Sequence, residues 1–369
     1  MSVSRFSWFL PTGGDGRIPG GATVFEGRSA DSTRRVANVR YLAQVAQAAE
    51  LAGFDALLTP VGLGCPDPWT VSAAVAQHTE RIRFLVAARI GLTSPTLLAQ
   101  QADTFARLTN GRIAINAVTG GDPLEQRAYG DQLGHDDRYA RTAETLDVVR
   151  RLLSGENVTY DGDHVHIANA QLTGLSGHDV PIYFGGASPA AEGVASAFAD
   201  VALMWGEPVD AVTERVNRLQ DRARAAGRDL RTGIRLHVIA RDSSAQAWAE
   251  AELIQSRFDP EAIRRTQERF ARMDSVGQAR MAALHGGKSA RDLEVAPNLW
   301  AGIGLVREGA GTALVGSHDE VADRLAEYAA AGIDEFILSG YPHLEEALRV
   351  GEEVVPRVLA RIGALPKAE

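Results

Sequence analysis

Residues 82–118 read IRFLVAARIGLTSPTLLAQQADTFARLTNGRIAINAV, and this stretch contains the pattern that decides the fold. The apolar runs at 82–88 and 112–118 predict two buried strands, because each run is short and bounded by turn residues. Between them, residues 96–107 have the spacing of an amphipathic helix. A strand, a helix and a second strand in this order predict a βαβ unit, whose two strands lie parallel in one sheet.

The same alternation extends outward to both ends of the chain. Further apolar runs predict strands at 6–10, 55–59, 180–184, 201–204, 234–239 and 335–338. Helical patterns lie between most of these runs, at 41–52, 69–77, 139–153, 190–197, 209–226 and 320–331. The repeated strand–helix alternation predicts an α/β fold, a (β/α)₈ TIM barrel with long insertions. The alternative is an open doubly wound sheet, but residues 11–16, PTGGDG, lack the glycine fingerprint that normally follows its first strand.

Two stretches are longer than a minimal barrel requires. Residues 17–39 form a polar connection rich in Gly, Ser and Arg, and residues 256–314 are an excess between the predicted seventh and eighth strands. Insertions on the βα loops of a barrel lie over the mouth of its active site. We therefore expect 256–314 to form a mobile lid that excludes water, with a static helical excursion or an oligomer contact as the alternatives. We expect a single domain over residues 1–369.

Composition and charge exclude several classes of protein. The 369 residues carry a formal net charge of −9, and 45% of them are hydrophobic, which excludes global disorder. An acidic chain without a polybasic patch predicts no nucleic-acid partner, and the lack of an uncharged run of about 18 residues predicts no membrane span. Cys65 is the single cysteine, which excludes an intrachain disulfide, and the start of the chain shows no signal-peptide pattern. We expect a cytoplasmic protein.

The predicted strand at 234–239 places two basic side chains inside the barrel. Ile234, Leu236 and Val238 share one face, which suits packing against outer helices, so Arg235 and His237 point inward. A buried cation is costly unless it is paired or binds an anion. We therefore expect Arg235 to bind an anionic substrate and His237 to donate a hydrogen bond or carry a proton. An Arg–carboxylate pair inside the barrel is the alternative.

The loops after the predicted fourth and fifth strands carry signals of a phosphate site. Residues 183–189 read YFGGASP, and Ser188 stands where it can cap the next helix, with Pro189 at the first helical position. A glycine loop at a helix N-terminus turns backbone N–H groups toward an anion. His135 and Tyr139, at the helix start after the fourth strand, can complete the same site. A tight turn without a ligand, with Tyr139 merely packed, is the alternative.

Three further side chains stand just after predicted strands. Trp205 can wall an apolar pocket, and the hydroxyl of Tyr341 can donate a hydrogen bond to a reacting oxygen. Cys65 lies in the loop after the second predicted strand, where a barrel carries catalytic residues. A lone cysteine is nevertheless more often an inert apolar side chain than a nucleophile. His164 and His166 have the spacing of a surface β-hairpin with no third ligand, so we expect no metal site.

Matching stretches along nearly the whole chain carry a resemblance to a known family. These stretches are 8–12, 84–87, 116–122, 183–186, 205–208, 233–239, 270–285, 297–316 and 338–346. Through them the sequence resembles the bacterial luciferase-like flavin monooxygenases, and within that family the FMNH₂-dependent alkanesulfonate monooxygenases. The resemblance implies an eight-stranded barrel with a mobile segment over its mouth, assembled as a homotetramer.

The resemblance also implies a chemistry and a set of site residues. Reduced FMN would come from a separate NAD(P)H-dependent FMN reductase, O₂ would be the co-substrate, and an alkanesulfonate would be cleaved at its C–S bond to an aldehyde and sulfite. The implied catalytic residues are Cys65, Arg235, His237, Arg307 and Tyr341, with Trp205 in the substrate pocket. For the flavin, the resemblance implies Tyr139, Ala187 and Ser188 near the phosphate, with Asn116 and His135 also lining the site.

Three departures from the family pattern concern the substrate side. Gly13 stands where the pattern has a histidine, Leu63 stands where it has an arginine, and the loop at 17–39 is longer. Another organosulfur compound or small anion is therefore an alternative substrate. A flavin-binding protein without turnover and a deazaflavin in place of FMN are further alternatives.

Overall fold

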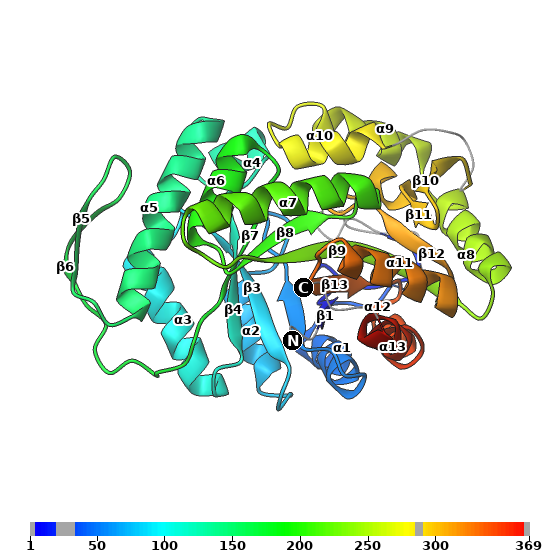
Figure 1. The fold of residues 1–369 in the computed structure, drawn as a ribbon, viewed down its shortest axis with the longest axis horizontal. Helices are drawn as coiled ribbons and strands as arrows, with labels where there is room; N and C mark the ends of the chain where they lie inside the picture. Colours follow the sequence, from blue (N-terminus) through cyan, green and yellow to red (C-terminus); the bar gives the residue numbers. More distant parts are fainter. Residues whose placement is uncertain (1–3, 20–33, 285–290, 365–369) are drawn as a thin grey trace.

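Eight parallel strands close into a barrel (Figure 1). The computed structural model describes residues 4–19, 34–284 and 291–364. Within them, the barrel strands are β1 (Arg5–Phe9), β2 (Ala56–Thr59), β3 (Arg83–Arg89), β4 (Ile113–Val118), β7 (Ile182–Gly185), β8 (Val201–Trp205), β9 (Arg231–Arg241) and β13 (Glu335–Ser339). Each strand pairs in parallel with its neighbours, and β13 closes the ring by pairing with both β9 and β1. The predicted barrel is confirmed, and the open sheet is not.

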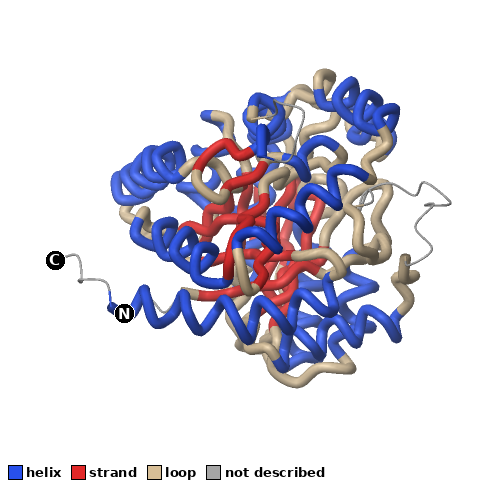
Figure 2. The backbone as a smooth tube through the Cα atoms, turned by 90° about the vertical axis from the view of Figure 1, so that its right-hand side faces the viewer, coloured by secondary structure: helices blue, strands red, loops and turns tan. Residues whose placement is uncertain are grey.

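Helices surround the barrel and connect its strands (Figure 2). They are α1 (Val39–Leu51), α2 (Pro68–Ala76), α3 (Pro95–Thr109), α5 (His135–Leu153), α6 (Pro189–Phe198), α7 (Val209–Ala225), α11 (His318–Ala330), α12 (His343–Arg349) and α13 (Val355–Ala364), with a π-helical turn at Val350–Val354. Three of them begin alike, with a capping side chain at Asp67, Ser94 or Ser188 followed by proline. This pairing satisfies a free N–H group and starts the helix directly after the strand loop.

Two layers of apolar side chains hold the barrel together. The outward faces of the strands, including Ile234, Leu236 and Val238 of β9, belong to the large core beneath the helices. The inward faces form a smaller cluster that includes Phe9 and Ile337. Because strand residues alternate between the two faces, Arg235 and His237 project into the barrel, as the sequence predicts.

The chain between β9 and β13 builds a layer at one end of the barrel (Figure 1). It contains α8 (Ser244–Ser256), α9 (Pro260–Phe270), α10 (Val276–Ala283), β10 (Glu294–Ala296), β11 (Leu299–Trp300), a 3₁₀ turn at Gly302–Leu305 and β12 (Ala313–Ser317). The expected lid at 256–314 falls on this layer, although its residues 285–290 lie outside the described residues.

β12 is a strand that the sequence patterns did not predict, and it begins within the stretch 256–314. β9 is longer than β8, so its far half extends past the last residue of β8. β12 pairs in parallel with that half, from His237 to Arg241. The apolar run of β12 is too short to show a strand periodicity. It becomes a strand because it pairs with the edge of β9 that β8 leaves free.

Two smaller insertions complete the fold. β5 (Val158–Asp161) and β6 (His166–Ala170) form an antiparallel hairpin that extends away from the barrel, which confirms the predicted surface hairpin (Figure 1). The short helix α4 (Pro123–Ala128) follows β4. In the loop predicted at 17–39, residues 20–33 lie outside the described residues, while Asp15 and Arg35 exchange two backbone hydrogen bonds beside it. No helix in the described segments has the length and apolar character that a membrane span requires.

Candidate functional site

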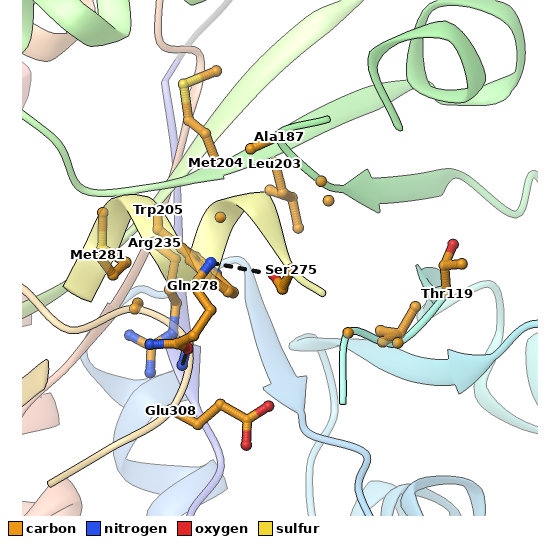
Figure 3. A pocket seen from close by; sticks show the side chains of 18 of the residues that line it. Thr119, Ala187, Leu203, Met204, Trp205, Arg235, Ser275, Gln278, Met281 and Glu308 are labelled. Carbon is orange, nitrogen blue, oxygen red and sulfur yellow. Dashed lines mark hydrogen bonds between the residues drawn. The ribbon is translucent and has the colours of Figure 1, made fainter. Parts of the chain in front are cut away.

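A cavity of about 290 Å³ opens at the carboxyl ends of the barrel strands. Its walls come from β2, β3, β4, β7, β8, β9 and β13, and from two segments of the insertion, 273–281 and 307–310. Figure 3 shows Arg235 and Trp205 from the barrel beneath the helix that carries Gln278 and Met281. The cavity therefore lies where the expected lid meets the barrel.

Arg235 is a buried cation whose partners are all neutral. Its Nη1 donates to the Leu236 carbonyl at 3.0 Å and to Ser339 Oγ at 2.9 Å, and its guanidinium lies 4.7 Å from the centroid of the Phe9 ring. Its Nη2 is buried without a hydrogen-bond partner. Burial, and secondarily the charge of Arg307, lower the pKa of Arg235 to about 9. Burial therefore makes the charged form of Arg235 unfavourable, and a bound anion would stabilise that form.

Arg307 reaches the same place from the insertion. Its guanidinium lies 5.1 Å from the centroid of the Phe9 ring, and its Nη1 lies 3.2 Å from His237 Nε2. Its Nε is buried without a hydrogen-bond partner. Among the described residues, neither guanidinium forms an ion pair with a carboxylate. The alternative of an Arg–carboxylate pair is therefore wrong for Arg235, and the structure brings two cations together without a counterion. The buried carboxylate of Glu335 pairs instead with Arg231, at the start of β9.

His237 and Tyr341 lie beside the arginine pair. Burial, followed by the charges of Arg235 and Arg307, holds the pKa of His237 well below its usual range, so the ring is neutral near neutral pH. The ring stacks on Tyr341, with centroids 5.5 Å apart and an interplanar angle of 15°. The Tyr341 hydroxyl is buried without a hydrogen-bond partner, and burial raises its pKa. It therefore keeps its proton and can donate it in a hydrogen bond.

A glycine loop at the other end of the cavity forms a cradle. Gly185, Gly186, Ala187 and Ser188 all line the cavity. A Cβ on Gly186 would lie 2.4 Å from the Cβ of Ala191, so only glycine fits there. Ser188 caps α6 by accepting from the Ala191 N–H at 3.1 Å.

Tyr139 joins this cradle from the first turns of α5. It lines the cavity as Ser188 does, and a Cβ on Gly186 would lie 3.3 Å from its hydroxyl oxygen. Burial raises the pKa of its hydroxyl, which stays protonated and can donate to an anion. The structure therefore brings together Tyr139, Ala187 and Ser188 of the residues predicted for a phosphate.

Arg215 belongs to the cradle, and the sequence analysis missed it. It comes from α7, lines the cavity and donates to the Gly186 carbonyl, while its Nε is buried without a hydrogen-bond partner. The nearest carboxylate, Glu192, is 3.7 Å away and is bound more closely by Arg218 at 2.7 Å. Burial lowers the pKa of Arg215.

A sequence signal for Arg215 existed. The buried face of α7 consists of Val212, Arg215, Val216, Leu219 and Ala223, at helical spacing. An arginine in such an apolar stripe indicates a buried cation that needs an anion.

The remaining predicted residues divide into two groups. Asn116, Ala187 and Trp205 line the cavity. Cys65 and His135 are not among its lining residues. Burial raises the pKa of the Cys65 thiol to about 11, although Arg307 opposes that shift, and this disfavours the reactive thiolate.

His135 faces a different partner. Its Nδ1 lies 2.6 Å from Asp136, and its ring centroid lies 4.8 Å from that of Tyr139. The described contact of His135 with the cradle is therefore with the ring of Tyr139. In the part of the chain that the structure describes, no group of three His, Cys, Asp or Glu side chains is placed to hold a metal ion.

Polar contacts fasten α10 over the cavity. Asp274, just before α10, accepts from Arg138 Nη2 at 2.6 Å, and the Asp274 N–H donates to the Gly121 carbonyl at 3.2 Å. On α10 itself, Arg280 forms a two-point ion pair with Glu207, which follows β8. The insertion thus closes the cavity from above in this structure.

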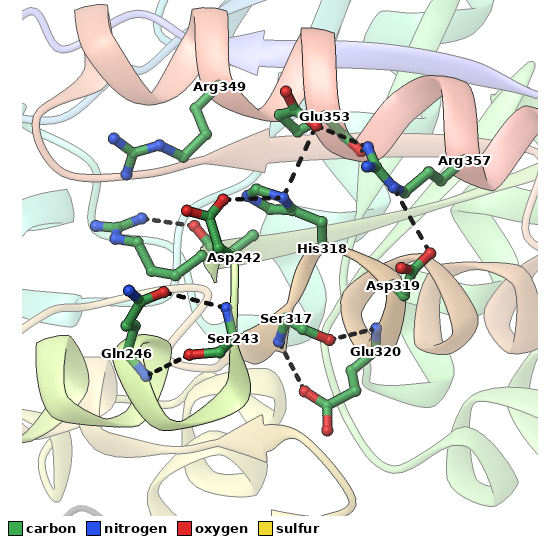
Figure 4. Close-up of polar contacts among 12 residues, drawn as sticks. Asp242, Ser243, Gln246, Ser317, His318, Asp319, Glu320, Arg349, Glu353 and Arg357 are labelled. Carbon is green, nitrogen blue, oxygen red and sulfur yellow. Dashed lines mark hydrogen bonds and ion pairs between the residues drawn. The ribbon is translucent and has the colours of Figure 1, made fainter.

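A second hollow lies on the outer side of the barrel between α8, α11 and the π-helical turn (Figure 4). Several of its polar groups lie close to one another or to neighbouring side chains. Glu353 accepts from Arg357 at 2.9 Å, and His318 Nδ1 lies 3.8 Å from Glu353 and 3.9 Å from Asp242. Among the described residues, this hollow contains no pair of buried charges without a counterion like Arg235 and Arg307. The cavity at the carboxyl ends of the barrel strands is therefore the candidate site.

Comparisons with known proteins agree with this architecture. The family described as luciferase-like monooxygenase matches residues 4–335. EDTA monooxygenase from Chelativorans sp. BNC1 superposes with a TM-score of 0.77 at 21% identity, covering 99% of this chain and 95% of that one. The oxygenating constituent of 3,6-diketocamphane monooxygenase from the CAM plasmid of Pseudomonas putida, solved with FMN, gives 0.69 at 17% identity, with coverage of 99% and 100%.

A coenzyme F420-dependent enzyme shares the fold as well. The tetrahydromethanopterin reductase from Methanopyrus kandleri superposes with a TM-score of 0.66 at 18% identity, covering 97% of this chain and 100% of that one. At these identities the three structures establish a common fold and leave the substrate of this chain open.

Proposed function

The chain belongs to the luciferase-like monooxygenase family, and from that premise we propose that it is an FMNH₂-dependent alkanesulfonate monooxygenase. The observation that carries this proposal is the pair of buried guanidinium groups, Arg235 and Arg307, without a carboxylate partner. In the proposed reaction, an alkanesulfonate, FMNH₂ and O₂ give an aldehyde, hydrogensulfite, FMN and water.

A sulfonate matches the donors that the arginine pair leaves free. It keeps its negative charge near neutral pH and offers three oxygen acceptors. Arg235 Nη2 and Arg307 Nε are both buried donors without an acceptor, and a sulfonate oxygen on each would form a charge-assisted hydrogen bond. The apolar wall, which includes Leu203, Trp205 and Ile337, suits the alkyl chain of the substrate.

The cradle at the other end of the cavity fits the phosphate of FMN. Gly186 leaves room for close approach, Tyr139 and Ser188 offer hydroxyl groups, and Arg215 offers a buried donor without a partner. These residues would hold FMN, which in its reduced form would supply the two electrons that activate O₂. The protein's own part is to hold the sulfonate beside the flavin and to exclude water with the insertion.

The polar side chains near the arginines have distinct roles in this proposal. Tyr341 keeps its proton because burial raises its pKa, and it donates a hydrogen bond to an oxygen of the substrate. His237 is neutral and orients its neighbours. We assign no covalent step to Cys65, because its raised pKa keeps the thiol protonated.

The test is a sulfite-release assay over a series of alkanesulfonates with enzymatically reduced FMN. We expect sulfite only when the sulfonate, FMNH₂ and O₂ are all present, and only with an NAD(P)H-dependent FMN reductase or chemically reduced flavin as the source. Absence of sulfite from the whole series would reject this substrate class.

Arg307→Ala tests the arginine pair directly. We expect kcat/KM for the sulfonate to fall by about 100-fold, since a charge-assisted hydrogen bond in a buried site contributes about 1.5–3 kcal/mol. FMN affinity should not change. Arg272→Ala, an exposed arginine of the same insertion, is the matched control. Equal activity of the two variants would remove Arg307 from the site.

A second candidate is a monooxygenase for another organosulfur compound or small organic anion. The described contacts recognise negative charge and contain nothing specific for sulfur, which favours keeping this candidate. Oxygen consumption that an anion stimulates without sulfite release would support it. The two cofactors are distinguished by measuring the affinity of the protein for FMNH₂ and for a reduced deazaflavin in parallel titrations. The cofactor that binds more tightly is the one the site accepts.

A further inference from the structure

Ser339 lies at the centre of the contacts between Arg235 and His237. It is the last residue of β13, has no exposed surface and stands opposite His237 in the strand register. Its Oγ lies 2.9 Å from Arg235 Nη1 and 2.8 Å from His237 Nδ1. A guanidinium can only donate, so Ser339 Oγ accepts from Arg235. The proton of the Ser339 hydroxyl then has His237 Nδ1 as its acceptor.

This arrangement determines the tautomer of His237. If Nδ1 accepts from Ser339, the proton of the neutral ring is on Nε2. Nε2–H then donates to the Ala310 carbonyl, which lies 3.1 Å away and can only accept. In the opposite tautomer Nδ1–H would donate to Ser339 Oγ, and the Ser339 hydroxyl proton would lose its acceptor. The lone pair of Nε2 would then face the Ala310 carbonyl, and each such loss in a buried site is costly.

The tautomer in turn determines what Arg307 can bind. Arg307 Nη1 lies 3.2 Å from His237 Nε2, but in this tautomer both nitrogens carry hydrogen. The imidazole therefore offers Arg307 no acceptor, and the free donors of Arg307 and Arg235 remain available for a third group. With the proton on Nδ1, His237 Nε2 would accept from Arg307 and compete with an anion for that arginine.

We propose that Ser339 is a positioning residue that holds His237 in its Nε2–H form and so keeps both arginines available to the substrate anion. This inference rests on the proposed anion-binding function of the pair. It assigns Ser339 no contact with the substrate, only an action through His237 and Arg235. The bond from Nε2–H to Ala310 also holds the segment that carries Arg307, because the two residues lie in one short loop.

The tautomer is measured directly by long-range ¹H–¹⁵N NMR of protein labelled with ¹⁵N-histidine. The chain has nine histidines, and loss of one signal set in His237→Gln assigns the resonances of His237. We expect the Nε2–H pattern for His237 in the protein as isolated and in the presence of methanesulfonate. An Nδ1–H pattern in the wild type would overturn the inference.

Substitution of Ser339 tests the consequence for binding. In Ser339→Ala we expect the His237 signals to shift toward the Nδ1–H pattern and the calorimetric affinity for methanesulfonate to fall about tenfold, the effect of losing one hydrogen bond in the network. Ser339→Thr keeps the hydroxyl and should keep both the tautomer and the affinity. Unchanged signals and affinity in a folded Ser339→Ala protein would overturn the inference.

The two proposals fail in different ways. The NMR pattern of the wild type requires no ligand, so it decides the role of Ser339 even if methanesulfonate does not bind. Failure of the wild type to bind methanesulfonate would contradict the proposed sulfonate site. A wild type that binds methanesulfonate with His237 in the Nδ1–H form would contradict only the role of Ser339.

Discussion

If the flavin site is as proposed, we expect Arg215 to distinguish FMN from riboflavin, because only FMN carries the phosphate that its buried guanidinium can bind. Arg215→Gln removes the charge and keeps most of the side-chain length. We expect FMN affinity to fall by about 10- to 100-fold, as for the loss of a charge-assisted hydrogen bond, while riboflavin affinity stays unchanged. Flavin fluorescence titration measures both. Arg218→Gln is the control, because Arg218 lies on the same helix as Arg215 but binds Glu192 of α6 and does not line the cavity. Equal losses for both flavins would contradict this role.

Arg235 should make anion binding sensitive to alkaline pH. An ordinary guanidinium stays protonated at every pH used in an assay, but burial and Arg307 lower the pKa of Arg235 to about 9. The protonated form binds the anion, so the affinity for methanesulfonate should be constant below pH 9. It should fall by about tenfold per pH unit above that value.

Calorimetry in buffers of different ionisation enthalpy provides the check on Arg235. Above pH 9 each binding event should take up a proton, because the bound anion restores the charge of the guanidinium. Below pH 9 no proton should be exchanged at this residue. An affinity that stays constant to pH 10 would show that Arg235 keeps its ordinary pKa.

At the scale of elements, α10 closes the cavity through contacts that substitution can weaken. Asp274→Asn keeps the shape of the side chain but removes the charge that binds Arg138. If that contact contributes about 1.5 kcal/mol to the closed arrangement, the cavity opens about tenfold more often. Water then reaches the reacting flavin, and we expect more hydrogen peroxide and less sulfite per FMNH₂ oxidised.

A surface ion pair of the same insertion provides the control for Asp274. Glu261 and Arg264 form an exposed pair on α9, and such pairs contribute little to stability. Glu261→Gln should therefore leave the ratio of peroxide to sulfite unchanged. If Asp274→Asn behaves in the same way, the contact between Arg138 and Asp274 does not keep the cavity closed.

At the scale of the whole molecule, the barrel interior holds a buried cation, which should lower the stability of the fold. Arg235→Met replaces a buried charge without a counterion by an apolar side chain among Phe9 and Ile337. Such replacements often stabilise a protein, and we expect the free energy of unfolding to rise by about 1–3 kcal/mol in the absence of ligand. Methanesulfonate binding should be lost in the same variant. Urea denaturation measures the first effect and calorimetry the second.

Leu236→Met is the matched control for the two effects expected in Arg235→Met, a higher free energy of unfolding and the loss of methanesulfonate binding. Leu236 is the next residue of β9 and faces the outer core, where a swap of similar volume changes stability by less than about 1.5 kcal/mol. It should keep anion binding. A destabilised Arg235→Met protein would mean that the arginine contributes more to packing than its charge costs.

Local patterns were enough to predict the barrel and part of its site. The apolar runs and helical periods of single segments predict the barrel strands and the helices between them, because these signals depend only on neighbouring residues. Alternation along β9 likewise predicts that Arg235 and His237 face inward. The family resemblance pointed to Arg307, Tyr341 and the phosphate cradle, which the structure places in or beside one cavity.

The tertiary structure alone decided the rest. β12 is a strand because β9 extends past β8, and Arg215 reaches the cradle because α7 packs across the glycine loop. Cys65 follows a barrel strand, but the arrangement of the neighbouring loops leaves it outside the cavity lining. In this protein, the sequence by itself determined which segments become strands and helices and which faces are buried. Only the tertiary structure decided that Arg235 and Arg307 meet without a counterion. Their meeting depends on the distance between two segments far apart in the chain, and a local sequence pattern carries no information on that distance.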